Sequence, residues 1–528
     1  MNYINFDKTL AYAKLRELAA NYRGKEVFNK LDGARVRSCN VPAGAGLTYN
    51  YAAKNLDDTV LGVLRVLAHE QDLIGKYKLL LDGEVMNTGE NRKVLHHLLR
   101  GQLGKDVIYE GKNLGAFYKN ELERFAVFAA DVHAGKVTGG TGKRFTTAVQ
   151  IGIGGSDLGP RALYLALESW ARKEGKAKLA ARFISNVDPD DAAAVLAPLD
   201  LESTLFILVS KSGTTQETLA NELFVKDKLK KAGLNPAKHL LAVTSETSPL
   251  AHNSDYLDSF YIDDFIGGRY SATSGVGGVI LSLAFGADVF KEILNGAREA
   301  DKAALEPDLL KNAALLDALI GVWERNFLNY PYTAVLPYSQ ALSRFPAHLQ
   351  QLDMESNGKS VNRAGVKVDY ATGPVVFGEP GTNGQHSFYQ LLHQGTDIAP
   401  LQFIGFAESQ LGEDVEVDGS VSQTKLKANL AAQIIAFAKG KASENPNKNF
   451  EGGRPSSLIY GRRLTPAALG ALLAHFENKV MFQGFVWNLN SFDQEGVQLG
   501  KILTKQVLTA KGASGDSALD EYSKLLGV

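Results

Sequence analysis

Glu355 has the residue type and the sequence position that a proton-transferring acid needs. In the stretch QQLDMESNGKS (350–360) it follows Leu352 by three residues, so a helix here puts both on one inward-facing stripe, and Gly358 ends that helix. Burial and the negative end of a helix both disfavour a charged carboxylate, which suits a general base. A surface glutamate beside Lys359 fits the same spacing, so spacing alone leaves both interpretations open.

A hydroxyl-rich loop, SKSGTTQET (210–218), has the composition of a phosphate site. It follows a predicted strand and opens a predicted helix, whose first turn offers unpaired N–H groups. Gly213 lets the backbone approach a ligand, and hydroxyls come from Ser210, Ser212, Thr214, Thr215 and Thr218. The spacing is not that of a Walker loop. Helix capping by Thr214 with Glu217 also fits the pattern, and the two roles are compatible.

A second loop, IGIGGSDLGPRA (151–162), also joins a predicted strand to a predicted helix. Gly155 frees the backbone, and Ser156 can cap the helix or contact a ligand. The glycine spacing does not match the dinucleotide-binding template. A tight turn without any ligand explains the loop equally well.

Arg269 and His386 could supply positive charge and protons. Arg269 lies among glycines and hydroxyls in GGRYSATSGVG, where an arginine can stabilise an oxyanion, although an ion pair with Asp263 or Asp264 is the more ordinary interpretation. His386 begins a predicted helix in GTNGQHSFYQLLHQG and can exchange protons near neutral pH. A hydrogen-bonded structural role is the alternative, and it is preferred for His393. The two histidines lack i,i+4 spacing and a nearby carboxylate, so no metal site is expected.

Lys501 ends the stretch FVWNLNSFDQEGVQLGK, in which Gln494 is a further polar candidate. Val497 lies one turn earlier on the same predicted helix face, so Lys501 is expected to be partly buried. A lysine that reaches solvent from a helix flank is the alternative, and Gln494 fits a plain loop residue.

The overall composition restricts the possible partners. The chain has 528 residues, more than one hydrophobic core usually supports, and its 57 basic and 58 acidic side chains give a net charge of −1. No basic surplus indicates nucleic acid, and no apolar run is long enough to cross a membrane. The single cysteine, Cys39, excludes an intrachain disulfide and a cysteine-based metal site. The start of the chain lacks the pattern of a secretory signal, so a soluble cytoplasmic protein is expected.

These candidate residues lie in a chain whose pattern changes near residue 130, from mainly helical to strands alternating with helices. Strands are predicted at 147–153, 204–209, 239–244, 332–337, 374–378, 401–407 and 456–461. Helices are predicted from about Arg161, from Thr215 to Lys231, through 278–328, and after Thr465 as N-cap. Such alternation predicts an α/β fold, with parallel sheets covered on both faces in two tandem units.

Seven separated segments together resemble the glucose-6-phosphate isomerase (phosphoglucose isomerase) family. They are NTGENRKVLHHLLR (87–100), IGIGGSDLGPRA, SKSGTTQET, GGRYSATSGVG, QLDMESNGKS, GTNGQHSFYQLLHQG and SFDQEGVQLGK. The resemblance implies two sugar-isomerase (SIS-like) αβα sandwich domains, a homodimer, and no metal or cofactor. With the change of pattern, it gives a helical segment at 1–130, α/β domains at 131–290 and 291–510, and a helical tail at 511–528.

The resemblance also implies roles for residues at matching positions. Glu355 matches the catalytic base, Arg269 the arginine that stabilises an enediolate, and Lys501 the lysine near the ring oxygen and C1. His386 matches a ring-opening histidine that the partner subunit contributes in this family. Phosphate contacts are implied for Ser210, Lys211, Ser212 and Thr215, and further substrate contacts for Gly155, Ser156, Gln351 and Gln494.

The chain departs from the family pattern at two places. Ser212 and Gly213 replace a common Thr-Phe, and Gln498 replaces a glutamate near Lys501. Residues before about 50 resemble the family poorly. Reversible isomerisation of glucose 6-phosphate and fructose 6-phosphate is the expected function. A sugar-phosphate sensor without turnover and a related aldose–ketose isomerase are the alternatives.

Overall fold

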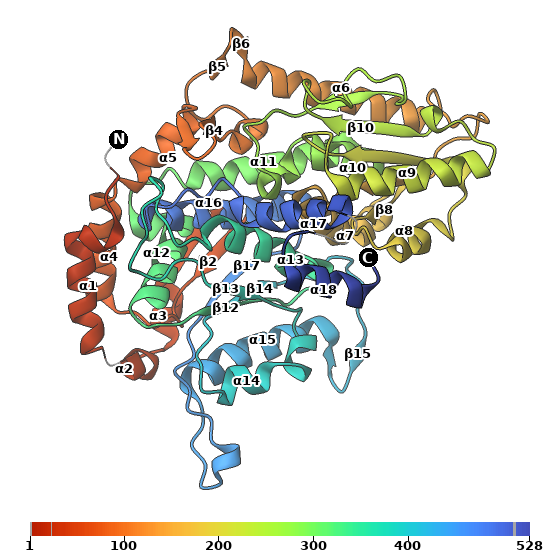
Figure 1. Ribbon diagram of the computed structural model, residues 1–528. Coiled ribbons are helices and arrows are strands. Elements are labelled where there is room, and N and C mark those ends of the chain that lie inside the picture. Colours follow the sequence, from red (N-terminus) through yellow and green to blue (C-terminus); the bar gives the residue numbers. More distant parts are fainter. Residues whose placement is uncertain (1–2, 23, 511–513) are drawn as a thin grey trace. The chain divides into compact units, whose positions relative to one another are not determined.

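The computed structural model of this protein describes residues 3–22, 24–510 and 514–528. The chain forms two compact units, one that runs to Ser491 and one from Phe492 to Val528. Figure 1 labels their helices and strands. The smaller unit contains η12 (Glu495–Val497), α17 (Gln498–Ala510) and α18 (Ser517–Leu526). The tail predicted at 511–528 begins in residues 511–513, outside the described residues, and the other predicted domain boundaries stay predictions.

The first sheet of the larger unit is parallel throughout, as predicted. Its strand order is β11-β10-β9-β7-β8. The strands are β7 (Thr147–Ile151), β8 (Ala180–Ile184), β9 (Thr204–Val209), β10 (Leu240–Thr244) and β11 (Ser259–Tyr261). Strands β8 and β11 were not predicted from the sequence. Alternating burial in β8 and the three-residue length of β11 gave no continuous apolar run to detect.

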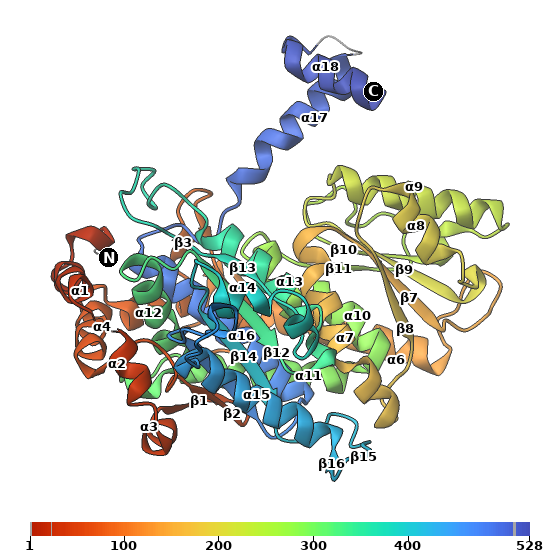
Figure 2. The same cartoon turned by 90° about the horizontal axis from the view of Figure 1, so that it is seen from below.

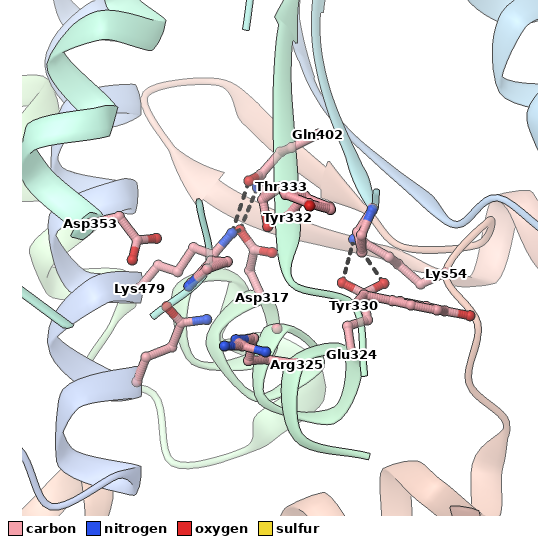
Figure 3. Close-up of a pocket in the computed structure, with 14 residues that line it drawn as sticks. Lys54, Asp317, Glu324, Arg325, Tyr330, Tyr332, Thr333, Asp353, Gln402 and Lys479 are labelled. Carbon is pink, nitrogen blue, oxygen red and sulfur yellow. Dashed lines mark hydrogen bonds and ion pairs between the residues drawn. The ribbon is translucent and has the colours of Figure 1, made fainter. Parts of the chain in front are cut away.

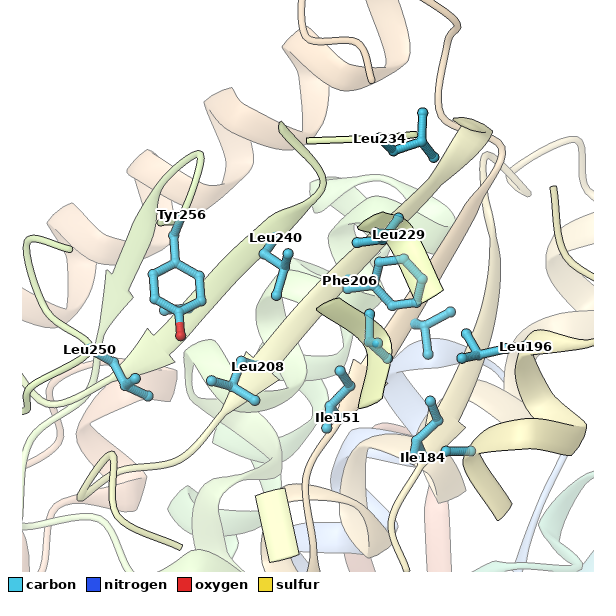
Figure 4. Packing of buried hydrophobic residues seen from close by; sticks show 14 residues of the cluster. Ile151, Ile184, Leu196, Phe206, Leu208, Leu229, Leu234, Leu240, Leu250 and Tyr256 are labelled. Atoms are coloured by element: carbon cyan, nitrogen blue, oxygen red, sulfur yellow. The ribbon is translucent and has the colours of Figure 1, made fainter. Parts of the chain in front are cut away.

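Helices cover both faces of this sheet (Figure 2). One face packs against α8 (Pro189–Leu196) and α9 (Gln216–Lys231), and the other packs against α10 (Gly275–Phe285). The core beneath α8 and α9 contains Ile151, Phe206, Leu208 and Leu229 with almost no exposed surface (Figure 4). Burying each such side chain contributes about 1.5–3 kcal/mol, which explains why the strands are runs of apolar residues.

The second sheet is mixed, which corrects the prediction of parallel sheets only. Its order is β1-β2-β17-β14-β12-β13, from β12 (Tyr332–Pro337), β13 (Val375–Phe377), β14 (Leu401–Phe406) and β17 (Ser456–Gly461), with β1 (Asn40–Gly44) and β2 (Leu47–Asn50). Strands β12, β13, β14 and β17 run parallel to one another. The hairpin β1–β2 pairs with β17 in the antiparallel sense. Strands β1 and β2 are short and lie in a mainly helical segment, so the sequence pattern did not predict them.

Helices also cover both faces of the second sheet. On one face, α14 (Tyr389–Gln394) and α15 (Ser422–Lys439) share a core with β12 and β14. On the other face lies α16 (Pro466–Val486), which begins at the predicted N-cap Thr465 and is buried along nearly its whole length. The charged side chains buried on this helix are paired, Glu477 with Arg100 and Lys479 with Asp317.

The remaining elements frame these two sheets. Helices of the first 134 residues are α1 (Leu10–Ala20), α2 (Gly24–Asn29), α3 (Gly33–Ser38), α4 (Asp58–Glu70), α5 (Leu73–Leu81) and α6 (Leu114–Ala134). Short hairpins are formed by β3 (Val85–Asn87) with β4 (Arg92–Lys93), β5 (Ile108–Tyr109) with β6 (Lys112–Asn113), and β15 (Glu416–Val417) with β16 (Ser420–Val421). The helical stretch predicted at 278–328 consists of α10, α11 (Ala287–Ala303) and α12 (Ala313–Asn326).

One predicted helix start and one predicted helix cap need correction. The helix expected from about Arg161 is α7 (Leu158–Lys173), which starts three residues earlier. Helix α9 has Thr215 as its N-cap, so Thr214 lies outside the helix and does not form a capping box with Glu217. Within the described ranges, no helix is both long enough and apolar enough to cross a lipid bilayer.

Candidate active site

The candidate site begins at the point where the first sheet reverses its strand order. From β7 the chain moves to β8 on one side, and β9, β10 and β11 follow on the other. In such sheets ligands bind at the carboxyl ends of the two strands that flank the reversal, here β7 and β9. The loops predicted to bind a ligand, after Ile151 and after Val209, both start at these strand ends.

The loop after β9 presents hydroxyls and backbone N–H groups together. Ser210 Oγ lies 3.0 Å from Thr215 Oγ1 and accepts a hydrogen bond from the N–H of Gly213, which has a positive φ of 65°. Ser212 and Thr214 are exposed, and the Thr214 hydroxyl donates to Ser212 Oγ at 2.9 Å. This arrangement precedes the N-terminus of α9, which favours an anion.

The ammonium group of Lys211 contacts groups outside this loop. Its Nζ donates to the carbonyl of Ile266 at 3.3 Å and lies 3.9 Å from Asp264 Oδ1. Burial lowers the pKa of Lys211, against the opposing effect of Asp264. The Lys211 carbonyl accepts from the Ser245 N–H, so the main chain of this loop is tied to the strand edge beside it.

The loop after β7 packs directly on the segment that carries Arg269. Its turn η3 (Gly154–Ser156) contacts η6 (Gly268–Thr273). A Cβ atom added to Gly155 would lie 2.1 Å from the carbonyl carbon of Gly268, so only glycine allows this approach. Gln150 of β7 donates to the Ser156 carbonyl at 2.7 Å and fixes the far side of the turn.

Arg269 and Glu355 lie next to each other. Arg269 is 1% exposed, and its Nη1 lies 3.6 Å from Glu355 Oε2. The ordinary interpretation of Arg269, an ion pair with Asp263 or Asp264, is wrong. Tyr118 donates to Asp263, and Asp264 pairs with Arg92 and Lys211. The guanidinium of Arg269 therefore places a positive charge beside the carboxyl group of Glu355.

Glu355 ends a wide helical turn rather than a regular α-helix. The short helix α13 (Phe345–Gln350) continues as the π-helical turn η9 (Gln351–Glu355), and helical backbone ends at Asn357. The side chain of Glu355 is 23% exposed, which agrees with its predicted half-buried position. Lys359 Nζ donates to the main-chain carbonyl of Glu355 at 3.3 Å. π-Helical turns of this kind are frequent at functional sites.

Gln351 begins η9 and faces the glycine loop. A Cβ atom added to Gly154 would lie 3.2 Å from Gln351 Nε2. The Gln351 Oε1 atom is buried, and no described atom is its hydrogen-bond partner. A buried acceptor without a partner costs free energy, so a ligand or water that donates to it would bind favourably.

The side chain of His386 is exposed. It lies in the short turn η10 (Asn383–His386), which follows β13 of the second sheet. Among the described residues, no hydrogen bond or ion pair joins His386 to Glu355. His393, in contrast, stacks on Phe437 at 3.7 Å and bonds to a glutamine, as a structural histidine does.

Lys501 and Gln494 belong to the smaller unit. Lys501 lies in the first turn of α17, and Val497 immediately precedes that helix. The side chains of Lys501 and Val497 are exposed. Lys501 therefore lacks, within this unit, the partial burial that was predicted from the sequence. Gln494 is the residue before η12.

Three residues around Arg269 were not predicted from the sequence to belong to the site. Ser356 Oγ accepts from Arg269 Nε at 2.6 Å, the Ser491 carbonyl accepts from Nη2 at 2.6 Å, and the Tyr270 hydroxyl lies 3.0 Å from Ser356 Oγ. Ser356 and Tyr270 are sequence neighbours of two predicted site residues, which was the available signal. No sequence pattern indicates the Ser491 carbonyl. Within the described chain, no group of three or more metal-ligating side chains could hold a metal ion.

Fold and geometry together define an α/β protein whose candidate site lies at the carboxyl edge of a parallel sheet. The sequence model of the family described as Phosphoglucose isomerase matches residues 50–523, and the chain belongs to this family. The match begins at residue 50, after the N-terminal stretch that resembles the family poorly.

Individual relatives match the chain over nearly its whole length. A glucose-6-phosphate isomerase of Treponema denticola is 63% identical, over 99% of this chain and 100% of its own. One of Borreliella burgdorferi is 50% identical over 99% of both chains. The crystal structure of a glucose-6-phosphate isomerase from Chlamydia trachomatis has a TM-score of 0.90 and 44% identity, over 97% of both chains. The fold and the resemblance are therefore confirmed.

Proposed function

We propose that this protein reversibly converts glucose 6-phosphate and fructose 6-phosphate into each other. The observation that carries the proposal is the position of Glu355, a half-buried carboxylate 3.6 Å from the buried guanidinium of Arg269. The relatives named glucose-6-phosphate isomerase match almost the whole chain and support the same reaction.

The phosphate of the substrate binds first in this proposal. Its acceptor oxygens take hydrogen bonds from the hydroxyls of Ser210, Ser212 and Thr215 and from the main chain at Lys211. The dipole of α9 favours its negative charge. Gly155, Ser156, Gln351 and Gln494 contact the sugar. Binding energy from the unreactive phosphate thereby positions the carbons that react.

Ring opening needs one proton to move from O1 to the ring oxygen. We assign this step to His386 and Lys501. The exposure of His386 supports its contribution to the site of a partner subunit, so the proposal includes a homodimer. The step moves a proton between two oxygens of one molecule, and it requires neither a metal nor a cofactor.

Isomerisation follows on the open chain. The Glu355 carboxylate takes the proton from C2, the carbonyl oxygen at C1 gains negative charge, and a cis-enediolate forms. The guanidinium of Arg269 offsets this charge. Glu355 then returns the proton to C1 while the hydroxyl proton of O2 passes to O1, so that C2 becomes the ketone and O1 a hydroxyl group. One carboxylate thereby serves both transfers at carbon. This reaction belongs to glycolysis and gluconeogenesis. The proposal includes a cytoplasmic location, since charged sugar phosphates do not cross a lipid bilayer.

A coupled assay tests the proposed function directly. The purified full chain is supplied with fructose 6-phosphate, and glucose 6-phosphate is detected through its oxidation by a dehydrogenase. We expect multiple turnovers without an added metal or cofactor for the isomerase. Saturable binding of fructose 6-phosphate without turnover would overturn the proposal in favour of a sugar-phosphate sensor. Turnover of another aldose–ketose phosphate pair alone would indicate a related isomerase.

A further inference from the structure

The guanidinium of Arg269 is held by neighbours that have no assigned part in the reaction. Its Nε donates to Ser356 Oγ at 2.6 Å, and its Nη2 donates to the Ser491 carbonyl at 2.6 Å. These bonds leave Nη1 directed toward Glu355. A charge buried to this extent is stable only when its donors are paired, so the bonds determine the direction of the guanidinium.

Ser356 is the central member of this arrangement. It has no exposed surface and directly follows Glu355, so the same turn carries the carboxylate and the group that holds the arginine. A serine hydroxyl has one hydrogen and two acceptor lone pairs. One lone pair accepts from Arg269 Nε, and the Tyr270 hydroxyl lies 3.0 Å away as the second hydrogen-bond partner.

Tyr270 contacts Ser356 through its hydroxyl group. Its ring is buried and stacks on His96, with a centroid separation of 4.7 Å and an interplanar angle of 28°. Burial raises the pKa of the Tyr270 hydroxyl to about 12, so the phenol keeps its proton at neutral pH. The ring therefore presents a hydroxyl of constant protonation to Ser356.

We infer that Ser356, supported by Tyr270, is a positioning residue that sets the direction of the Arg269 guanidinium toward the reacting oxygens. This inference rests on the proposed role of Arg269 as the group that stabilises the enediolate. The physical reason is that rotation about the Arg269 Cδ–Nε bond swings both terminal nitrogens, and the bonds to Ser356 and to the Ser491 carbonyl together oppose this rotation. Displacing a stabilising group by about 1 Å can cost about 10²-fold in rate.

The Ser356→Ala variant tests the inference. It removes the acceptor of Arg269 Nε, so we expect kcat for fructose 6-phosphate to fall about 10- to 100-fold while KM changes less than about threefold. Tyr270→Phe keeps the ring and removes only the hydroxyl, so a smaller loss of kcat is expected. Ser282→Ala is the matched control, because this serine is fully buried and its hydroxyl has no partner among the described atoms. The control should keep wild-type kcat.

A double-mutant cycle separates positioning from a structural role. In an Arg269→Ala background, Ser356→Ala should cause no further loss of kcat, because the group that it positions is gone. Losses that multiply in the double variant would overturn the inference, as would a wild-type kcat in Ser356→Ala. If Ser356→Ala does not fold, the cycle is run with Tyr270→Phe under the same criteria. A wild-type protein without turnover would instead contradict the proposed function itself.

Discussion

Two carboxylates lie two residues apart on η9, and their surroundings differ. Glu355 is partly exposed and lies beside the Arg269 guanidinium. Asp353 is 8% exposed and lines a small internal cavity with Lys479 and Asp317 (Figure 3). One Asp353 oxygen is buried and has no hydrogen-bond partner among the described atoms. The same short turn therefore has a side that a ligand can reach and a closed side.

The difference shows how environment assigns roles to similar groups. Burial raises the pKa of Asp353 to about 6, with Lys479 opposing the shift. The cavity that Asp353 lines has a volume of about 10 Å³, which is too small for a sugar phosphate. Glu355 has both access and an adjacent positive charge, as a base that works beside a developing oxyanion requires. A pair of carboxylates in unlike environments thus separates into one catalytic candidate and one structural group.

Glu355→Gln tests the open side of η9 and should have the largest effect. The amide keeps the size of the side chain and cannot accept the C2 proton. We expect kcat to fall by about 10³-fold or more with KM nearly unchanged, in a coupled assay with fructose 6-phosphate. Asp353→Asn is the matched control on the same turn. Near-normal turnover of Glu355→Gln would remove Glu355 as the base.

Arg269→Ala tests the partner of that carboxylate and ranks second. Without the guanidinium, charge on the enediolate lacks its nearest cation, so kcat should fall by about 10²- to 10³-fold and by more than KM rises. Arg269→Lys should restore little, because an ammonium cannot reproduce the planar donor set. A change confined to KM would mean that Arg269 only binds substrate.

Thr215→Val tests the hydroxyl loop, where a binding effect is expected instead. The substitution keeps the shape of the side chain and removes one donor to the phosphate, so KM should rise about tenfold while kcat changes little. Thr218→Val, one turn farther along α9, is the control, since its buried hydroxyl has no partner among the described atoms. A loss confined to kcat in Thr215→Val would place this loop in the chemical step.

Asp353→Asn tests the closed side and should have the smallest effect on activity, with kcat within about threefold of wild type. Its main expected effect is on the pH dependence of stability. The folded-state pKa of Asp353, about 6, exceeds its ordinary value of 3.8, so wild type gains stability from this group at low pH and loses it as pH rises through about 6.

Urea unfolding of both proteins at pH 5 and pH 8 measures this effect. The wild-type free energy of unfolding, relative to that of Asp353→Asn, should be about 1 kcal/mol higher at pH 5 than at pH 8. A difference that is independent of pH would show that Asp353 does not titrate in this range.

The sequence predicted those features that depend on local pattern. Continuous apolar runs located β9 and β12, Thr465 located the start of α16, and hydroxyls with glycine located the loop before α9. The half-buried position of Glu355 followed from its spacing after Leu352. Each of these features is determined by residues within a few positions of one another, which a single sequence displays.

Features that depend on distant segments were not predictable in this way. The proximity of Arg269 to Glu355 joins residues 86 positions apart, and the hairpin β1–β2 pairs with β17 from the other end of the chain. Ser356 illustrates the same limit, because its bond to Arg269 exists only after both segments fold. Likewise, the sequence around Asp353 does not show that it lines an internal cavity.

The most direct test of the account follows a label through the transfer that Glu355 is proposed to perform. Glucose 6-phosphate carrying deuterium at C2 is converted in ordinary water, and the fructose 6-phosphate formed is examined for deuterium at C1. One carboxylate that takes and returns the same hydron predicts that part of the wild-type product carries the label at C1. With Glu355→Gln, labelled product should not form above background. Transfer of the label at the wild-type rate by Glu355→Gln would contradict the account.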